Sequence, residues 1–347
     1  IVLVVLVGGY TRLSGSGLSI TAWKPIHGVM PPLNENDWQE EFAAYQTTPQ
    51  YKLINKDMSV TGFKAIFWPE YLHRLLGRLI GVVFAIPLLV FTIRKSIMGC
   101  LLWRMIGIFA LGGLQGAVGW IMVKSGLETT PYVSHTKLAL HLSLAFTIFA
   151  LILWTIFDIV GCGNLRKKNN KSLYFSSSRY HISSYKFWFY LLCVQIVFGA
   201  FMAGLHAGLV YNTWPTMNGD FIPNDVFSSV KSKNDSSYLA MIMLRNIAFI
   251  QFTHRTLACF LTIGFLFWWY SHREYIRVNQ LSKGCVLVSF TIFMQFILGV
   301  LTLIYHVPLP IALMHHLTAL ILWSTAIYLL YLLTNCNNNE KYPELVK

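Results

Sequence analysis

The chain alternates between long apolar runs and polar connections. A helix rises about 1.5 Å per residue, so about 20 apolar residues cross a hydrocarbon core about 30 Å thick. The pattern predicts eight membrane-spanning helices, namely a first run that ends near Leu13 and then residues 72–93, 101–123, 138–160, 187–205, 247–270, 285–305 and 310–333. The first run is too short to cross alone, and we expect that its start precedes residue 1 or has been processed.

Positive charge distinguishes the connections from one another. Two long polar connections cover residues 14–71 and 206–245. Basic residues gather instead after the second, fourth and sixth spans, at Arg94, Lys95, Arg104, Arg166, Lys167, Lys168, Lys171, Arg179, Lys186, Arg273, Arg277 and Lys283. Loops on the cytoplasmic side of a membrane carry such an excess. We therefore predict that both termini face the cytoplasm or matrix and that both long connections face outward.

Composition supports a membrane protein. The 347 residues are 55% hydrophobic and 12% charged, with a mean hydropathy of +0.53, whereas soluble domains carry about 25% charged residues. In so apolar a chain, the net charge of +13 indicates membrane loops rather than a nucleic-acid partner. The six cysteines show no metal-binding spacing. We predict an all-α polytopic protein in contact with the lipid bilayer.

An internal repeat divides the chain. Gly17, Trp23 and Gly28 recur 191 positions later. Further pairs are His73 with His254, Arg74 with Arg255, Gln115 with Gln295, Gly119 with Gly299, and His141 with His315. Parallel repeats of this kind build many membrane proteins. We predict two pseudo-symmetric four-helix bundles, divided as an N-terminal half at 1–160, a basic linker at 161–186, a C-terminal half at 187–335 and a polar tail at 336–347.

Four histidines lie at similar depths near the outer ends of the even-numbered spans. They are His73, His141, His254 and His315. A ring nitrogen in hydrocarbon needs a hydrogen bond or a metal. A hydrogen bond explains a single buried histidine, whereas four in matching places indicate ligands. Because neutral imidazole binds haem iron and helix bundles hold such ligands on facing helices, we interpret them as two pairs of haem iron ligands.

Charged residues accompany the first histidine of each half. Arg74 and Arg255 are candidate contacts for haem propionates, and the alternative is an arginine that reaches the lipid headgroups. Glu70 lies one helical turn before His73, and its counterpart is Gln251. A carboxylate can move protons or stabilise positive charge. This asymmetry predicts a reacting haem in the first half and a static, electron-carrying haem in the second, unless Glu70 is an ordinary interfacial acid.

The spacing Gln-x-x-x-Gly occurs three times within the apolar runs. The copies are Gln115 with Gly119, Gln195 with Gly199, and Gln295 with Gly299. Because small residues let membrane helices approach one another closely, we interpret the motif as helix packing.

Several stretches together resemble the haem A synthase family. They are Gly8 to Ser19, Trp23-Lys24-Pro25, Pro31-Pro32-Leu33, Glu70 to Arg78, Gln115 to Val123 with Ser125-Gly126-Leu127, and Gln251 to Arg255. The resemblance covers nearly the whole chain. The first outer connection lacks the cysteine pair of another bacterial branch, so the chain is similar to the alphaproteobacterial and mitochondrial branch.

The resemblance implies an oxidoreductase that makes haem A for cytochrome oxidase. It would oxidise a ring methyl of haem O to a formyl group through hydroxylated intermediates. His73 and His141 would hold the substrate haem, His254 and His315 would hold haem b, and Glu70 would be catalytic. The family usually has glutamine after the last histidine, but here His316 follows it, so His316 stays an alternative ligand or a partner of the ligand.

Other functions share some of these features. A membrane b-type cytochrome would have the four histidines without needing Glu70, and a haem or ion transporter would have the repeat without needing all four as ligands. A prenyl transferase would need aspartate-rich motifs, which the sequence lacks. A haem O synthase is the expected source of substrate. The electron acceptor, homo-oligomerisation and the choice between the bacterial cell membrane and the mitochondrial inner membrane are left open, with the haem sites expected toward the outer face.

Overall fold

The computed structural model describes residues 1–23, 27–128, 130–160, 178–227 and 243–335. These residues form helices and no named strand. The helices are α1 (Val2–Leu13), α2 (Glu35–Gln46), α3 (Pro49–Leu53), α4 (Val60–Ile93), α5 (Gly99–Leu127), α6 (His135–Val160), α7 (Ser178–Gly204), α9 (Ile247–Ser271), α10 (Arg273–Val278), α11 (Ser282–Ile304) and α12 (Leu309–Asn335). Short 3-10 turns lie at His27–Val29, Ala207–Leu209 and Asn224–Phe227.

Seven of the described helices are long and apolar enough to cross a membrane, namely α4, α5, α6, α7, α9, α11 and α12. The helix α1 is also apolar but shorter, with 12 residues. The prediction of an all-α polytopic membrane protein is therefore confirmed. The eighth span and the division into two bundles stay predictions.

The first long connection is more ordered than its polar sequence suggested. It contains α2 and α3, which the sequence analysis did not predict, and α4 begins at Val60 rather than at residue 72. Capping explains where these three helices begin. The side chains of Asn34, Thr48 and Ser59 each accept a hydrogen bond from a backbone N–H of the helix that follows.

An aromatic cluster fastens this connection to α4. Trp38, Phe42 and Tyr45 of α2 pack on Phe63, Phe67 and Tyr71 of α4, and all six side chains are buried. The rings of Tyr45 and Phe63 stack with their centroids 5.3 Å apart, and Trp38 meets Phe67 edge to face at 5.0 Å. Such pairs add to the stability gained from burial alone. The extension of α4 beyond the predicted span is therefore held by packing against α2.

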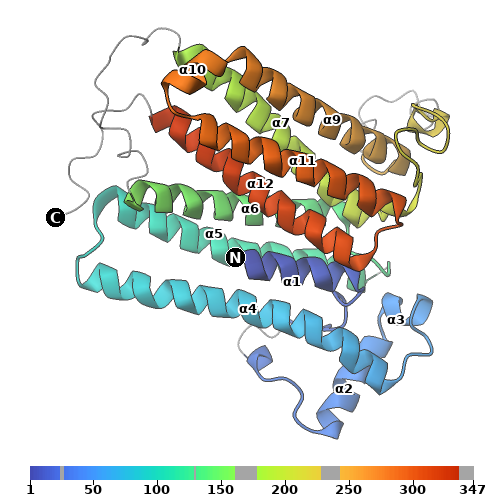
Figure 1. The fold of residues 1–347 in the computed structure, drawn as a ribbon. Helices are drawn as coiled ribbons and strands as arrows, with labels where there is room; N and C mark the ends of the chain where they lie inside the picture. Colours follow the sequence, from blue (N-terminus) through green and yellow to red (C-terminus); the bar gives the residue numbers. More distant parts are fainter. Residues whose placement is uncertain (24–26, 129, 161–177, 228–242, 336–347) are drawn as a thin grey trace, which may run out of the picture. The chain divides into compact units, whose positions relative to one another are not determined.

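The chain forms two compact units that interleave along the sequence. The first contains residues 1–148, 200–207 and 308–316, and the second contains 149–199, 208–307 and 317–347. In the first unit α1 lies alongside α4 (Figure 1), and in the second α9 packs on α11. Most of the predicted basic linker, 161–177, and the predicted tail, 336–347, lie outside the described residues, whereas 178–186 begins α7.

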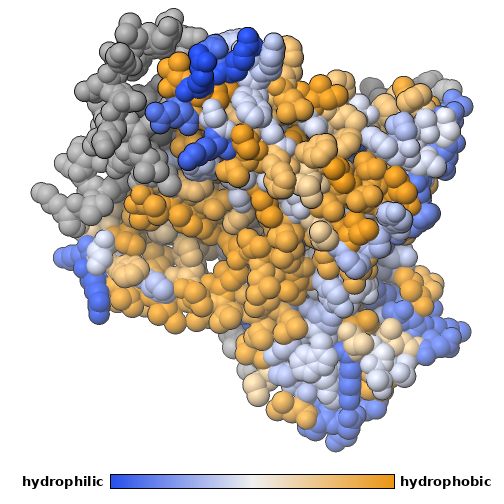
Figure 2. Space-filling view, viewed as in Figure 1, coloured by the Kyte–Doolittle hydropathy of each residue, from blue (hydrophilic) through white to orange (hydrophobic). Residues whose placement is uncertain are grey.

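The surface of the first unit follows the expected division between lipid and water. Figure 2 shows hydrophobic residues along α4 and hydrophilic residues over α2 and α3. Large apolar side chains of α4 such as Val83 and Leu89 are each 62% exposed. A soluble protein rarely exposes so much apolar surface, so this face of α4 suits a hydrocarbon environment.

We predict that Phe63→Ala loosens the outer connection. Removing a buried phenylalanine costs about 3–5 kcal/mol, which is a rise of roughly 100- to 5,000-fold in the open population. Trypsin cleavage at Lys52 or Lys56 should accelerate by that factor, whereas Leu33→Ala, a change at a residue that is 70% exposed, should leave it unchanged. An unchanged cleavage rate for Phe63→Ala would show that the cluster does not fasten this connection.

Candidate functional site

His73 of α4 lies against the backbone of α1. A Cβ atom added to Gly8 would lie 2.7 Å from Cε1 of His73, closer than real Cβ atoms come to other atoms. The ring Nδ1 of His73 also lies 3.2 Å from the carbonyl oxygen of Val4. The glycine therefore makes room for the imidazole between the two helices.

His141 of α6 has a similar environment against α5. A Cβ atom on Gly119 would lie 2.8 Å from Cε1 of His141. The side-chain amide of Gln115 donates to the backbone carbonyl of His141 at 3.1 Å, and it lies 3.2 and 3.3 Å from the two ring nitrogens. His73 and His141, the two predicted ligands of the first half, belong to the same unit and are close enough to interact electrostatically.

His254 of α9 repeats this arrangement in the second unit, against α7. A Cβ atom on Gly199 would lie 3.3 Å from Cε1 of His254. The amide of Gln195 donates to the backbone carbonyl of His254 at 3.1 Å and lies 3.4 Å from its Nε2. In two of its three copies, the Gln-x-x-x-Gly motif thus packs against a predicted ligand histidine.

The two histidines of α12 belong to the first unit. The ring of His316 lies against Gly9 of α1, where a side chain on the glycine would collide with it. Its Nε2 is buried and has no hydrogen-bond partner among the described residues. His315 and His254 belong to different units, so their pairing as ligands stays a prediction.

Glu70 is buried in α4, with 3% of its side chain exposed, and five hydrogen bonds converge on its carboxylate. Oε2 accepts from the backbone N–H and the hydroxyl of Ser19, both at 2.7 Å, and from the N–H of Ile20 at 3.0 Å. Oε1 accepts from Nε of Arg74 at 3.1 Å and from its Nη2 at 2.7 Å. The carboxylate thus ties residues 19 and 20 to α4.

Arg74 and Arg255 hold equivalent segments of the two halves. Arg74 donates to the carbonyls of Ile20 at 2.8 Å and Ala22 at 3.2 Å. Arg255 donates to the carbonyls of Tyr211, Thr213 and Thr216, with the Thr213 bond at 2.8 Å. Tyr211 and Thr213 lie 191 positions after Ile20 and Ala22, the offset of the sequence repeat. Together with its two bonds to Glu70, Arg74 makes four hydrogen bonds. Arg255 makes three, and its Nε has no partner among the described residues. The propionate contacts stay a prediction.

Gln251, the counterpart of Glu70, is fully buried but bonds differently. Its amide donates to the carbonyl of Val210 at 2.8 Å. Its Oε1 is buried with no hydrogen-bond partner among the described residues. The second half therefore holds its outer segment with a neutral amide, whereas the first half uses a carboxylate.

A further polar contact lies at the C-terminal end of α1. Nη2 of Arg12 donates to the carbonyl of Ala203 at 2.5 Å and lies 3.0 Å from Nε2 of His206. Burial and then the charge of Arg12 lower the pKa of His206 to about 4. The ring is therefore neutral at pH 7 and can accept a hydrogen bond from the arginine.

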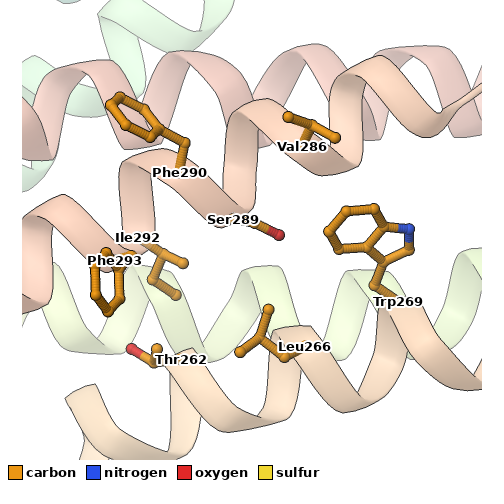
Figure 3. A pocket seen from close by; sticks show the side chains of 8 residues that line it. All are labelled: Thr262, Leu266, Trp269, Val286, Ser289, Phe290, Ile292 and Phe293. Atoms are coloured by element: carbon orange, nitrogen blue, oxygen red, sulfur yellow. The ribbon is translucent and has the colours of Figure 1, made fainter.

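The contacts of Gly8 and Ser19 were not predicted from the sequence, and Gly199 was interpreted there as a packing residue without its contact to His254. One signal was present, because the offset of 191 relates Gly8 to Gly199. A cavity of about 340 Å³ lies between α9 and α11. Figure 3 shows the side chains that line it, namely Thr262, Leu266, Trp269, Val286, Ser289, Phe290, Ile292 and Phe293. The cavity contains none of the predicted site residues, and its exposed apolar walls suit contact with lipid chains.

Comparison with known proteins places the chain in a family. The family model described as cytochrome oxidase assembly protein (COX15-CtaA) matches residues 1–327. The chain is 40% identical to a heme A synthase of Wolbachia pipientis over 332 residues, which is 95% of this chain and 88% of that protein. It is 40% identical to a heme A synthase of Nitrosospira multiformis over 93% of this chain and 87% of the relative.

A third relative, the heme A synthase of Parvibaculum lavamentivorans, is 38% identical over 94% of this chain and 89% of its own length. No solved structure matches the chain significantly. Because the family model and these relatives both cover nearly the whole chain, the protein belongs to the cytochrome oxidase assembly protein family.

Proposed function

We propose that the protein is a haem A synthase, a membrane oxidoreductase that oxidises a ring methyl of haem O to the formyl group of haem A. The observation that carries the proposal is the identity of 38–40% to heme A synthases over 93–95% of the chain. The resemblance noted in the sequence implies that the product serves cytochrome oxidase. We propose a haem O synthase as the source of substrate.

Four histidines would hold the two haems. We propose His73 and His141 as ligands of the substrate and His254 and His315 as ligands of a resident haem b. The described ligand environments fit this role, because Gly8, Gly119 and Gly199 leave room beside three of the rings. Neutral imidazoles between packed helices suit haem iron. A bound haem b would supply a redox centre that accepts and passes on electrons.

The finer architecture is part of the same proposal. We propose eight spans in two four-helix bundles, with α1 as the outer end of the first span and the repeats at 1–160 and 187–335. Both termini would face the cytoplasm or matrix, because loops on that side of a membrane carry an excess of basic residues. The haem sites would then lie toward the outer face. The aromatic cluster and the bonds to Glu70 support the proposal that the first long connection is an ordered segment on the outer side.

Glu70 is the proposed catalytic residue. The carboxylate is buried in the half that holds the substrate ligands, and its counterpart in the other half is the neutral Gln251. Its five hydrogen bonds fix a negative charge in a site of low dielectric, where it can stabilise developing positive charge. A b-type cytochrome that only carries electrons would not need this asymmetry.

We predict that Glu70→Gln abolishes product formation while haem stays bound. Losing a fixed charge beside the reacting group should slow the reaction by about 100-fold or more. The assay is pigment extraction after co-expression with a haem O synthase. Glu35→Gln, at an acid paired with Lys64 on the surface, should retain wild-type yield. A wild-type yield of haem A from Glu70→Gln would show that Glu70 has no part in the mechanism. If the folded wild-type protein, supplied with electron partners, left haem O unchanged, the result would favour the membrane b-type cytochrome.

We predict that His254→Ala and His315→Ala each lose haem b, because an iron deprived of one imidazole is held less tightly. The bound haem of each purified variant is measured by absorption spectroscopy. His316→Ala is the comparison, and it should keep its haem b. Full haem b content in His254→Ala would overturn the assignment of the resident haem to the second half. Loss in His316→Ala with retention in His315→Ala would make His316 the ligand.

We predict that Gly119→Val weakens haem binding at His141 by at least about tenfold, as changes next to a metal ligand commonly do. The valine Cβ would lie 2.8 Å from Cε1 of His141 and force the ring to move. Gly116→Val is the matched control on the same helix, because a Cβ there meets nothing within 4 Å. Equal haem O titrations for the two variants would show that this glycine does not shape the ligand site.

A further inference from the structure

Ser19 is a fully buried residue of the first outer connection that contacts Glu70 twice. Its backbone N–H and its hydroxyl both reach Oε2 of Glu70, each at 2.7 Å. An O–H donor at this distance from a carboxylate forms a short, charge-assisted hydrogen bond. The side chain and the backbone of this one residue therefore both donate hydrogen bonds to the same carboxylate oxygen.

The hydroxyl of Ser19 has a second acceptor within reach. The carbonyl oxygen of Ile66, one turn earlier in α4, lies 3.3 Å from Oγ. A hydroxyl carries a single hydrogen, so the two acceptors compete for it. The shorter distance and the greater charge both favour Glu70, which assigns this hydrogen to the carboxylate.

The second half shows what the segment needs for structure alone. The repeat offset of 191 places Val210 opposite Ser19. Val210 has no hydroxyl, and its carbonyl accepts from Gln251, while Arg255 still holds the following carbonyls. An outer segment of this shape is therefore held without a hydroxyl, and the hydroxyl appears together with the carboxylate.

We propose that Ser19 is a positioning residue that fixes the orientation of the Glu70 carboxylate. The inference rests on the proposed catalytic role of Glu70. Arg74 anchors Oε1 and Ser19 anchors Oε2, so rotation of the carboxylate about its terminal bond would break bonds on both sides. A charge held in this way needs little reorganisation during the reaction, which is the source of electrostatic stabilisation by an enzyme.

The test removes the hydroxyl from the full-length protein. Ser19→Ala should lower kcat about 10-fold or more, the effect of losing a hydrogen bond to a charged group, with the KM for haem O and the bound haem unchanged. Ser19→Cys fills the site with a slightly larger thiol that is only a weak donor, and it should behave in the same way. Ser16→Ala is the matched control, because Ser16 is also buried in this segment but its hydroxyl pairs with Ser14.

An infrared measurement reads the bond without relying on activity. The carboxylate band that Glu70→Gln removes should shift in Ser19→Ala and Ser19→Cys and stay in place in Ser16→Ala. Should Ser19→Ala fail to fold, Ser19→Cys takes its place. A wild-type kcat together with an unshifted band in the Ser19 variants would overturn the inference. A shifted band in a chain whose wild type makes no haem A would instead overturn the proposed function.

Discussion

Polar groups inside an apolar protein need partners, and the two halves of this chain meet the requirement with the same arginine contacts. Arg74 and Arg255 each donate to carbonyls of the segment that follows the first helix of their half. Irregular backbone becomes tolerable against a membrane helix when its carbonyls are satisfied in this way. In the first half, the carboxylate of Glu70 also bonds to this segment. The position of the carboxylate is therefore fixed by a segment that the arginine already holds in place.

Close packing of helices is the second constraint. An imidazole that lies between two helices needs space. Gly8 and Gly119 leave space that a Cβ atom would fill, whereas a Cβ atom at Gly199 would make a tight contact that a shift of a few tenths of an ångström relieves. The same contacts restrict where each ring can lie. The residues that let these helices pack closely therefore also place the predicted ligands. This explains why the Gln-x-x-x-Gly motif, which we interpreted from the sequence as helix packing, lies beside histidines.

Hydropathy was sufficient to predict the seven long helices, because burial in hydrocarbon imposes an apolar length on each span. It could not define how each helix is rotated, since lipid-facing and protein-facing positions are both apolar. The contact of Gly8 with His73 depends on that rotation. The helices α2 and α3 were not predicted, because in a polar connection the capping residues Asn34 and Thr48 do not stand out as helix starts. The bond between Ser19 and Glu70 joins residues 51 positions apart, beyond any local pattern.

The two halves share so much geometry that their differences carry information about chemistry. The carboxylate of Glu70 lies at the position that the amide of Gln251 occupies in the second half. The hydroxyl of Ser19 likewise corresponds to the side chain of Val210. The arginine contacts and the glycine beside the first histidine are common to both. A structural need shared by both halves cannot explain a group found in one half only. The carboxylate and its hydroxyl donor therefore support the proposal of a reaction confined to the first half.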